Sequence, residues 1–133
     1  MHLDNLVVIV TLLALIVYLW TGIRVGRARH RFEVKAPATN GPLGFECAYR
    51  AQMNTLEWLP LCLVPMWLFA WLWDPRIAAG LGLVWVLARV QYALGYTADP
   101  ARRTPGFMVQ AVVVMVLLAG DLGKAVYLAV TGG

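Results

Sequence analysis

Four long apolar runs dominate this 133-residue chain. Each is close to the roughly 20 residues that a helix needs to cross the apolar core of a bilayer. The runs are too continuous for the strands of a membrane barrel, in which lipid-facing and interior residues alternate. We therefore predict an all-α integral membrane protein, a single four-helix domain over residues 1–133. Its helices are expected at about residues 6–23, 45–73, 77–96 and 105–130.

The segments between the runs contain residues that end helices. The connection 24–44 holds Pro37 and Pro42 with Gly41, and the connection 73–76 is a tight turn. The third connection, 97–104, ends in Thr104-Pro105. This pair predicts that Thr104 is a helix N-cap followed by proline at the first helical position. These connections predict consecutive helices that run antiparallel.

The overall composition agrees with a membrane location. Hydrophobic residues make up 61% of the chain and charged residues 14%, whereas soluble domains average about 45–50% and about 25%. A disordered chain would need low hydrophobicity and high charge. This composition, rich in hydrophobic and poor in charged residues, also gives no reason to expect a nucleic acid partner.

Basic residues gather in the first and third connections. By the positive-inside rule these connections are cytoplasmic, and both termini are non-cytoplasmic. We interpret the basic cluster of the first connection, residues 24–35, chiefly as this topology signal, accompanied by contact with membrane lipid headgroups. The arginines and lysines of the two connections are Arg24, Arg27, Arg29, Arg31, Lys35, Arg102 and Arg103.

The cysteines and histidines predict neither a disulfide nor a metal site. Cys47 and Cys62 fall on the same expected helix, fifteen residues or about 22 Å apart, which is too far to bridge. A single cysteine in an apolar helix is usually a small buried hydrophobe. His2 and His30 are isolated from other ligand types.

Polar residues inside the second apolar run form a stripe. Glu46, Arg50, Asn54 and Glu57 are spaced four, four and three residues apart, so they share one helix face, whereas Gln52 lies off it. Ionisable groups at membrane depth are costly and usually mark a function or a specific pair.

The third apolar run carries a matching stripe of Arg89, Tyr92 and Tyr96. Arg89 is expected to meet Glu57 or Glu46 across a helix interface. Two further arginines, Arg102 and Arg103, directly precede the fourth helix, whose N-terminus favours an anion.

Two interpretations of the stripes are open. In the first, Glu57 pairs with Arg89 or Arg50, and Asn54 bonds across helices to hold the bundle together. In the second, which we favour, the polar residues line a cleft open to the cytoplasm. Its arginines would hold carboxylates, Glu57 would hold an ammonium group, and Asn54 and Gln52 would bind amides. Separately, Asp121 and Lys124 are expected to form a local ion pair near the outer interface.

Two segments resemble motifs of a known family. Residues 46–60 match the pattern E-x-x-x-R-x-Q-x-N-x-x-E-x-x-P, and residues 89–96 match R-x-x-Y-x-x-G-Y. Together they resemble the helix-two and helix-three signatures of the membrane-associated proteins in eicosanoid and glutathione metabolism (MAPEG). The resemblance extends over nearly the whole chain.

The resemblance implies a homotrimer that binds glutathione, bent into a U, at cytoplasm-facing protomer interfaces. It implies that Arg103, with Arg102 as the adjacent alternative, ionises the glutathione thiol. The positions implied to contact glutathione are Arg29, Arg50, Gln52, Asn54, Glu57, Arg89, Tyr92 and Tyr96.

The resemblance also implies an activity. Trp58 stands where leukotriene-synthase-like members have tyrosine, and His30 aligns with an arginine of that subgroup, so the pattern is closer to a general microsomal glutathione transferase. We expect conjugation of glutathione to an apolar or lipid electrophile that enters a groove between the first and fourth helices. Peroxidase activity toward lipid hydroperoxides is a related expectation. The alternatives are a non-enzymatic lipid-binding scaffold and a structural subunit of a membrane complex.

Overall fold

A computed structural model describes residues 4–133, and the predicted helices are present in it. Each is long and apolar enough to span a membrane, so the protein is an all-α integral membrane bundle with multiple passes. A short 3₁₀ turn, η1, was not predicted. The elements are α1 (Asp4–Arg31), α2 (Leu43–Leu72), α3 (Pro75–Ala98), η1 (Pro100–Arg103) and α4 (Thr104–Thr131).

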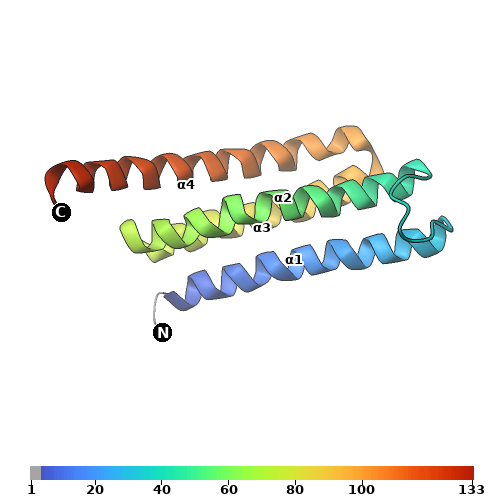
Figure 1. Cartoon of the computed structure of the whole chain (residues 1–133), viewed down its shortest axis with the longest axis horizontal. Coiled ribbons are helices and arrows are strands. Elements are labelled where there is room, and N and C mark those ends of the chain that lie inside the picture. The colour runs from blue at the N-terminus through green and yellow to red at the C-terminus, as the bar shows by residue number, and fades with distance from the viewer. Residues whose placement is uncertain (1–3) are drawn as a thin grey trace.

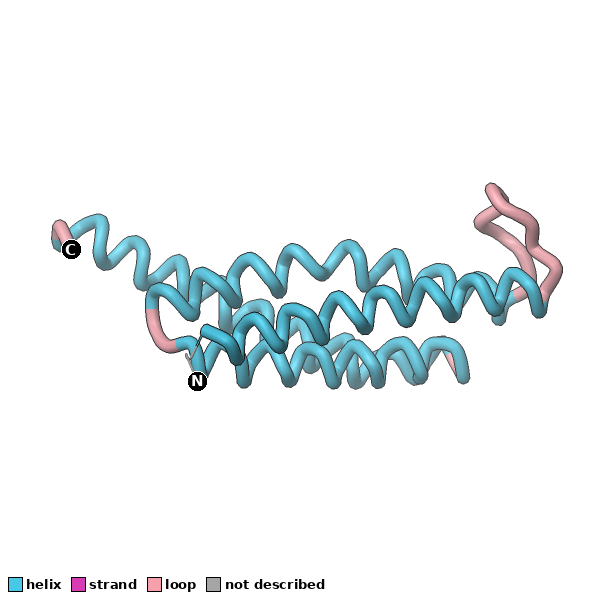
Figure 2. Tube along the Cα trace, turned by 90° about the horizontal axis from the view of Figure 1, so that it is seen from below, coloured by secondary structure: helices cyan, strands magenta, loops and turns pink. Residues whose placement is uncertain are grey.

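The helices α2 and α3 form a central pair, with α1 packed on one side of it and α4 on the other (Figure 1). The expected groove between the first and fourth helices is therefore absent from the described part of a single chain, because α2 and α3 separate them. The α1–α2 and α3–α4 connections lie at one end of the bundle, and the α2–α3 turn lies at the other, with the chain ends (Figure 2). We call the former the arginine-rich end.

The first helix is longer than predicted. It continues past Ile23 to Arg31, so the arginines assigned to a loop lie on α1 instead. Arginine is a good helix former, and its long apolar stem lets the charge reach the membrane surface without ending the helix. The chain leaves the helical conformation only at Glu33, where φ is 55°.

Aspartates cap the starts of α3 and η1, whereas α4 has no side-chain cap. Asp74 accepts hydrogen bonds from the backbone N–H of Arg76 at 2.7 Å and of Ile77 at 3.2 Å. The predicted N-cap role of Thr104 was wrong, because its hydroxyl donates to the Ala101 carbonyl at 3.3 Å. Since η1 leads directly into α4, the chain is already helical before Thr104 and has no extended N-cap position.

The predicted Asp121–Lys124 ion pair is also absent from the described residues. Lys124 lies over the ring of Trp73, with Nζ 4.9 Å from its centroid. Asp121 faces the bundle and is 6% exposed, and neither carboxylate oxygen has a hydrogen-bond partner within the chain. The aromatic ring at the end of α2 therefore takes the place of the expected carboxylate partner.

Glycines let the helices approach closely at two places, one at the start of α4 and one where α1 meets the central pair. A Cβ on Gly106 of α4 would lie 2.6 Å from the Ala88 carbonyl of α3, so the start of α4 rests directly on the α3 backbone. A Cβ on Gly82 would collide with the sulfur of Met66 and lie 2.8 Å from Val10 Cγ1. Gly82 thus marks the point where α1, α2 and α3 meet.

We predict that Gly82→Ala destabilises the protein by about 1–3 kcal/mol, because the stiff Val10 side chain has no room to move. Gly80→Ala is the matched control: it lies on the same helix, and its added Cβ would meet no atom within 4 Å. There, alanine should be neutral or stabilising. Thermal unfolding in detergent measures both, and equal melting temperatures for the two variants would contradict the packing argument.

Candidate functional site

A polar pocket of about 390 Å³ opens between α2, α3 and the start of α4 at the arginine-rich end. The structure brings together there many of the residues that the stripes predicted, from helices far apart in sequence. Phe107 was not predicted, although it follows the arginine pair by one helical turn. The lining residues are Arg50, Asn54, Tyr92, Tyr96, Arg103, Thr104 and Phe107.

Arg89 lies behind this polar pocket and joins α2 to α3. Its guanidinium donates to Asn54 Oδ1 at 3.0 Å and to Thr55 Oγ1 at 2.8 Å. The side chain is 0% exposed, and its Cζ lies 4.1 Å from the ring centroid of Tyr92. Arg89 therefore orients two residues of the pocket wall without lining it.

The expected ion pair of Arg89 with Glu57 or Glu46 is not present in the described part of the chain. Glu57 is exposed, and Glu46 accepts a hydrogen bond from the Gly41 N–H at 3.1 Å. The neutral oxygens of Asn54 and Thr55 face α3 and take the guanidinium instead. Thr55 was missed because it lies one residue off the polar stripe.

Aromatic rings form the side of the pocket nearer the membrane centre. The ring centroids of Tyr92 and Tyr96 are 5.6 Å apart, and Phe107 lies 6.3 Å from Tyr92. Trp58 packs edge-on against Phe107 at 5.4 Å. Trp58 thus extends the aromatic wall with an indole where a tyrosine would have placed a hydroxyl.

The neighbouring arginines of η1 point to different places. Arg103 faces the polar pocket, with Cζ 4.9 Å from the Tyr96 ring centroid, and it donates to the Pro100 carbonyl at 3.3 Å. Arg102 lines a separate groove along α3, and its own carbonyl accepts a hydrogen bond from Gln91 at 3.3 Å. Of the two arginines, Arg103 is the one that could act in the polar pocket.

Besides Arg89, three further predicted site residues do not line the polar pocket within one chain. Glu57 is exposed on α2, and Gln52 reaches toward Gly22 of α1, whose built Cβ would lie 3.1 Å from the Gln52 amide nitrogen. Arg29 lies near the end of α1, where it donates to the Ala38 carbonyl at 2.8 Å and stacks on Phe45. Because α1 packs on the far side of the central pair, Arg29 is remote from this pocket.

No group of three or more histidine, cysteine, aspartate or glutamate residues within 4–133 is placed to hold a metal ion. Cys47 and Cys62 are both free and buried. His2 lies outside the described residues. The side chains that line the pocket offer guanidinium, amide, phenol and hydroxyl groups.

A four-helix membrane protein with a polar pocket at one end is the class that the fold and the site define. The chain belongs to the MAPEG family, whose family model matches residues 7–122.

Known proteins with similar sequences support this membership. An uncharacterized protein of Synechocystis sp. is 46% identical over 114 residues, 86% of this chain and 83% of its own length. Microsomal glutathione S-transferase 2 of Mus musculus is 43% identical over 84 residues, 63% of this chain and 57% of its own. Leukotriene C4 synthase of Bos taurus is 36% identical over 110 residues, which are 83% of this chain and 73% of its own length.

We predict that Thr55→Val destabilises the fold by about 1–3 kcal/mol, because it leaves a buried charged donor of Arg89 without its acceptor. Thr11→Val is the matched control. Thr11 Oγ1 also accepts one side-chain hydrogen bond, at 3.0 Å, but from the neutral indole of Trp67. Unfolding in detergent should show the larger loss for Thr55→Val, and a larger loss for Thr11→Val would refute the anchoring role of Arg89.

Proposed function

We propose that this protein is a glutathione transferase that conjugates glutathione to apolar electrophiles held in the membrane. The observation that carries the proposal is the position of Arg103, a cation facing a pocket that also holds Arg50 and Asn54. Its relatives include a microsomal glutathione S-transferase and a leukotriene C4 synthase, and they support a membrane enzyme that uses glutathione.

The polar pocket is chemically suited to a peptide with two carboxylates. Arg50 offers a guanidinium for charge-assisted hydrogen bonds to a carboxylate. The amide oxygen of Asn54 already accepts from Arg89, so its NH₂ group is left facing the ligand as a donor. In this proposal Glu57 binds the ammonium group, and the hydroxyls of Tyr92 and Tyr96 contact the peptide.

Arg103 is proposed to hold the glutathione thiol as a thiolate. A free thiol has a pKa of about 8.5, and only the thiolate is a strong nucleophile. Lowering this pKa by about two units requires about 2.7 kcal/mol of preference for the charged form. A charge-assisted hydrogen bond from Arg103, assisted by the N-terminus of α4, is of that size.

The conjugation needs no nucleophile from the protein. The thiolate sulfur attacks an electrophilic carbon, a C–S bond forms, and the leaving group departs with the electron pair or an epoxide ring opens. The same thiolate could reduce a lipid hydroperoxide. It would take one oxygen and release the alcohol, and a second glutathione would then displace water to form the disulfide. We propose this peroxidase reaction as a secondary activity.

A second copy of the chain is proposed to complete the site. Arg50 and Glu57 are exposed on α2 within a span, where contact with lipid is costly. In a homotrimer, a neighbouring copy would cover this face and supply Arg29 and Gln52, the residues that the pocket lacks within one chain. The arginine-rich end would face the cytoplasm and both termini the opposite side.

The role of Arg103 predicts the behaviour of two adjacent variants. Arg103→Ala should retain glutathione but lose the ultraviolet thiolate absorbance at neutral pH, with absorbance returning as the pH rises toward about 8.5. The lowered pKa keeps the wild-type thiolate present below that pH. Arg102→Ala, which removes a charge from the adjacent groove, should resemble wild type. Thiolate absorbance unchanged in Arg103→Ala, or lost in Arg102→Ala, would reject Arg103 as the activator.

Sharing of the site between copies predicts complementation. Arg29→Ala and Arg103→Ala should each lose turnover when expressed alone. If Arg29 acts on its neighbour's site, co-expressed chains should form mixed trimers in which about a quarter of the sites are intact. Separately purified and mixed proteins that cannot exchange subunits provide the control. Absence of recovered turnover in verified mixed trimers would show that Arg29 does not act between copies.

A further inference from the structure

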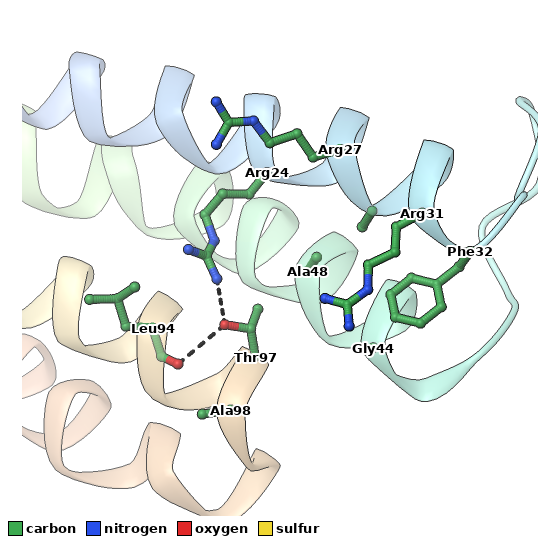
Figure 3. Close-up of a pocket in the computed structure, with 10 residues that line it drawn as sticks. Arg24, Arg27, Arg31, Phe32, Gly44, Ala48, Leu94, Thr97 and Ala98 are labelled. Carbon is green, nitrogen blue, oxygen red and sulfur yellow. Dashed lines mark hydrogen bonds between the residues drawn. The ribbon is translucent and has the colours of Figure 1, made fainter.

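A second pocket lies at the arginine-rich end, on the opposite side of the central pair from the polar pocket. It measures about 360 Å³ and is enclosed by α1, the start of α2 and the end of α3. We call it the arginine pocket, after Arg24, Arg27 and Arg31, which line it from α1 (Figure 3). It shares no lining residue with the polar pocket, and the proposed glutathione chemistry does not use it.

The three arginines share one face of α1 because they are spaced three and four residues apart. Arg24 donates to Thr97 Oγ1 at 2.6 Å and stacks on Trp20, and Arg31 lies over the ring of Phe32. Like charges at this spacing repel each other. No carboxylate pairs with these guanidinium groups in the part of the chain that the structure describes, so the pocket has an unbalanced positive charge.

The directions of these side chains suit an anion between α1 and α3. Arg24 and Arg31 reach from α1 into the space between the helices, one toward Thr97 and the other beside Phe32, while Arg27 lies along α1 (Figure 3). On the α2 side, Ala48 presents only a methyl group, and the Phe32 ring packs directly against Gly44. Guanidinium groups bind phosphate oxygens through paired, charge-assisted hydrogen bonds.

The groove along α3 that Arg102 lines at its end adjoins the arginine pocket, and the rest of its lining is mainly apolar. It shares Leu94 and Ala98 with the pocket and extends along α3 past Val90 to Leu87. Leu87 precedes Leu94 by seven residues, about 10 Å along the helix axis. Together, the arginine pocket and the groove present positive charge at the helix ends and a mainly apolar surface that runs along α3 into the membrane.

We propose that the arginine pocket binds the phosphate headgroup of an anionic phospholipid, with an acyl chain in the groove along α3. Basic pockets between membrane helices bind such headgroups, and the charge of this pocket is complementary to them. The apolar continuation past Leu94 distinguishes a lipid from a free phosphate, because a free phosphate would use only the arginines.

Native mass spectrometry of the protein in detergent can test this by titration with dioleoylphosphatidylglycerol or dioleoylphosphatidylcholine. The wild type should retain the anionic lipid preferentially. Arg31→Gln should weaken its retention about tenfold, the size expected for losing a hydrogen bond to a charged group. Lys35→Gln removes an exposed charge just beyond the end of α1 and outside the pocket, and it should bind as wild type does.

Two further arms separate the sources of the phosphate and test the groove. Leu87→Trp lies outside the arginine pocket and keeps every arginine but fills the groove, and it should also weaken retention of the anionic lipid. Soluble glycerol phosphate should not displace the lipid at equal concentration. Melting temperatures measured in phosphatidylcholine alone confirm that each variant is folded.

Several results would overturn the proposal. These are equal retention of the two lipids, an equal loss in Lys35→Gln and Arg31→Gln, full retention in Leu87→Trp, or displacement by glycerol phosphate.

Discussion

The buried guanidinium of Arg89 is the interaction on which the arrangement of this bundle depends. A charge taken out of water is costly unless most of its donors are paired. Asn54 and Thr55 of α2 accept from the two terminal nitrogens of Arg89 at 3.0 and 2.8 Å, and only the buried Nε has no hydrogen-bond partner among the described residues. Sliding α3 along α2 by one residue would break both bonds inside an apolar medium. Arg89 therefore fixes the register of the central helix pair.

That register determines what lies on each face of the pair. Tyr92 and Tyr96 follow Arg89 toward the arginine-rich end and face α4, where Arg103 joins them. Leu94 and Thr97 lie on the other side and face α1, where they meet Arg24. Because a helix has about 3.6 residues per turn, residues two positions apart, such as Tyr92 and Leu94, lie on opposite faces of it. One anchor thus positions a polar pocket on one face and an arginine pocket on the other.

The sequence predicted what is periodic and missed what depends on partners. Apolar runs predicted the helices, and the stripe through Arg50 and Asn54 predicted one side of the pocket. The predicted carboxylate partner of Arg89 was wrong, because the prediction assumed that opposite charges would pair. Neutral oxygens on the facing helix hold the guanidinium instead, at a lower desolvation cost than a carboxylate would have. The predicted end of α1 at Ile23 was wrong, because arginines do not end a helix and α1 continues to Arg31. Spacing along one helix also gave no indication that Asp121 would face inward.

In the proposed homotrimer, the exposed charges of α2 would connect assembly to ligand binding. A single chain that leaves Arg50 and Glu57 uncovered within a span has a face poorly suited to lipid. A ligand carrying both carboxylate and ammonium groups would offset those charges, and a neighbouring chain would remove them from lipid. If glutathione binds between copies, it binds only the assembled protein, so mass action makes it stabilise the assembly. The same polar stripe that provides the chemistry would then make isolated chains the less stable form.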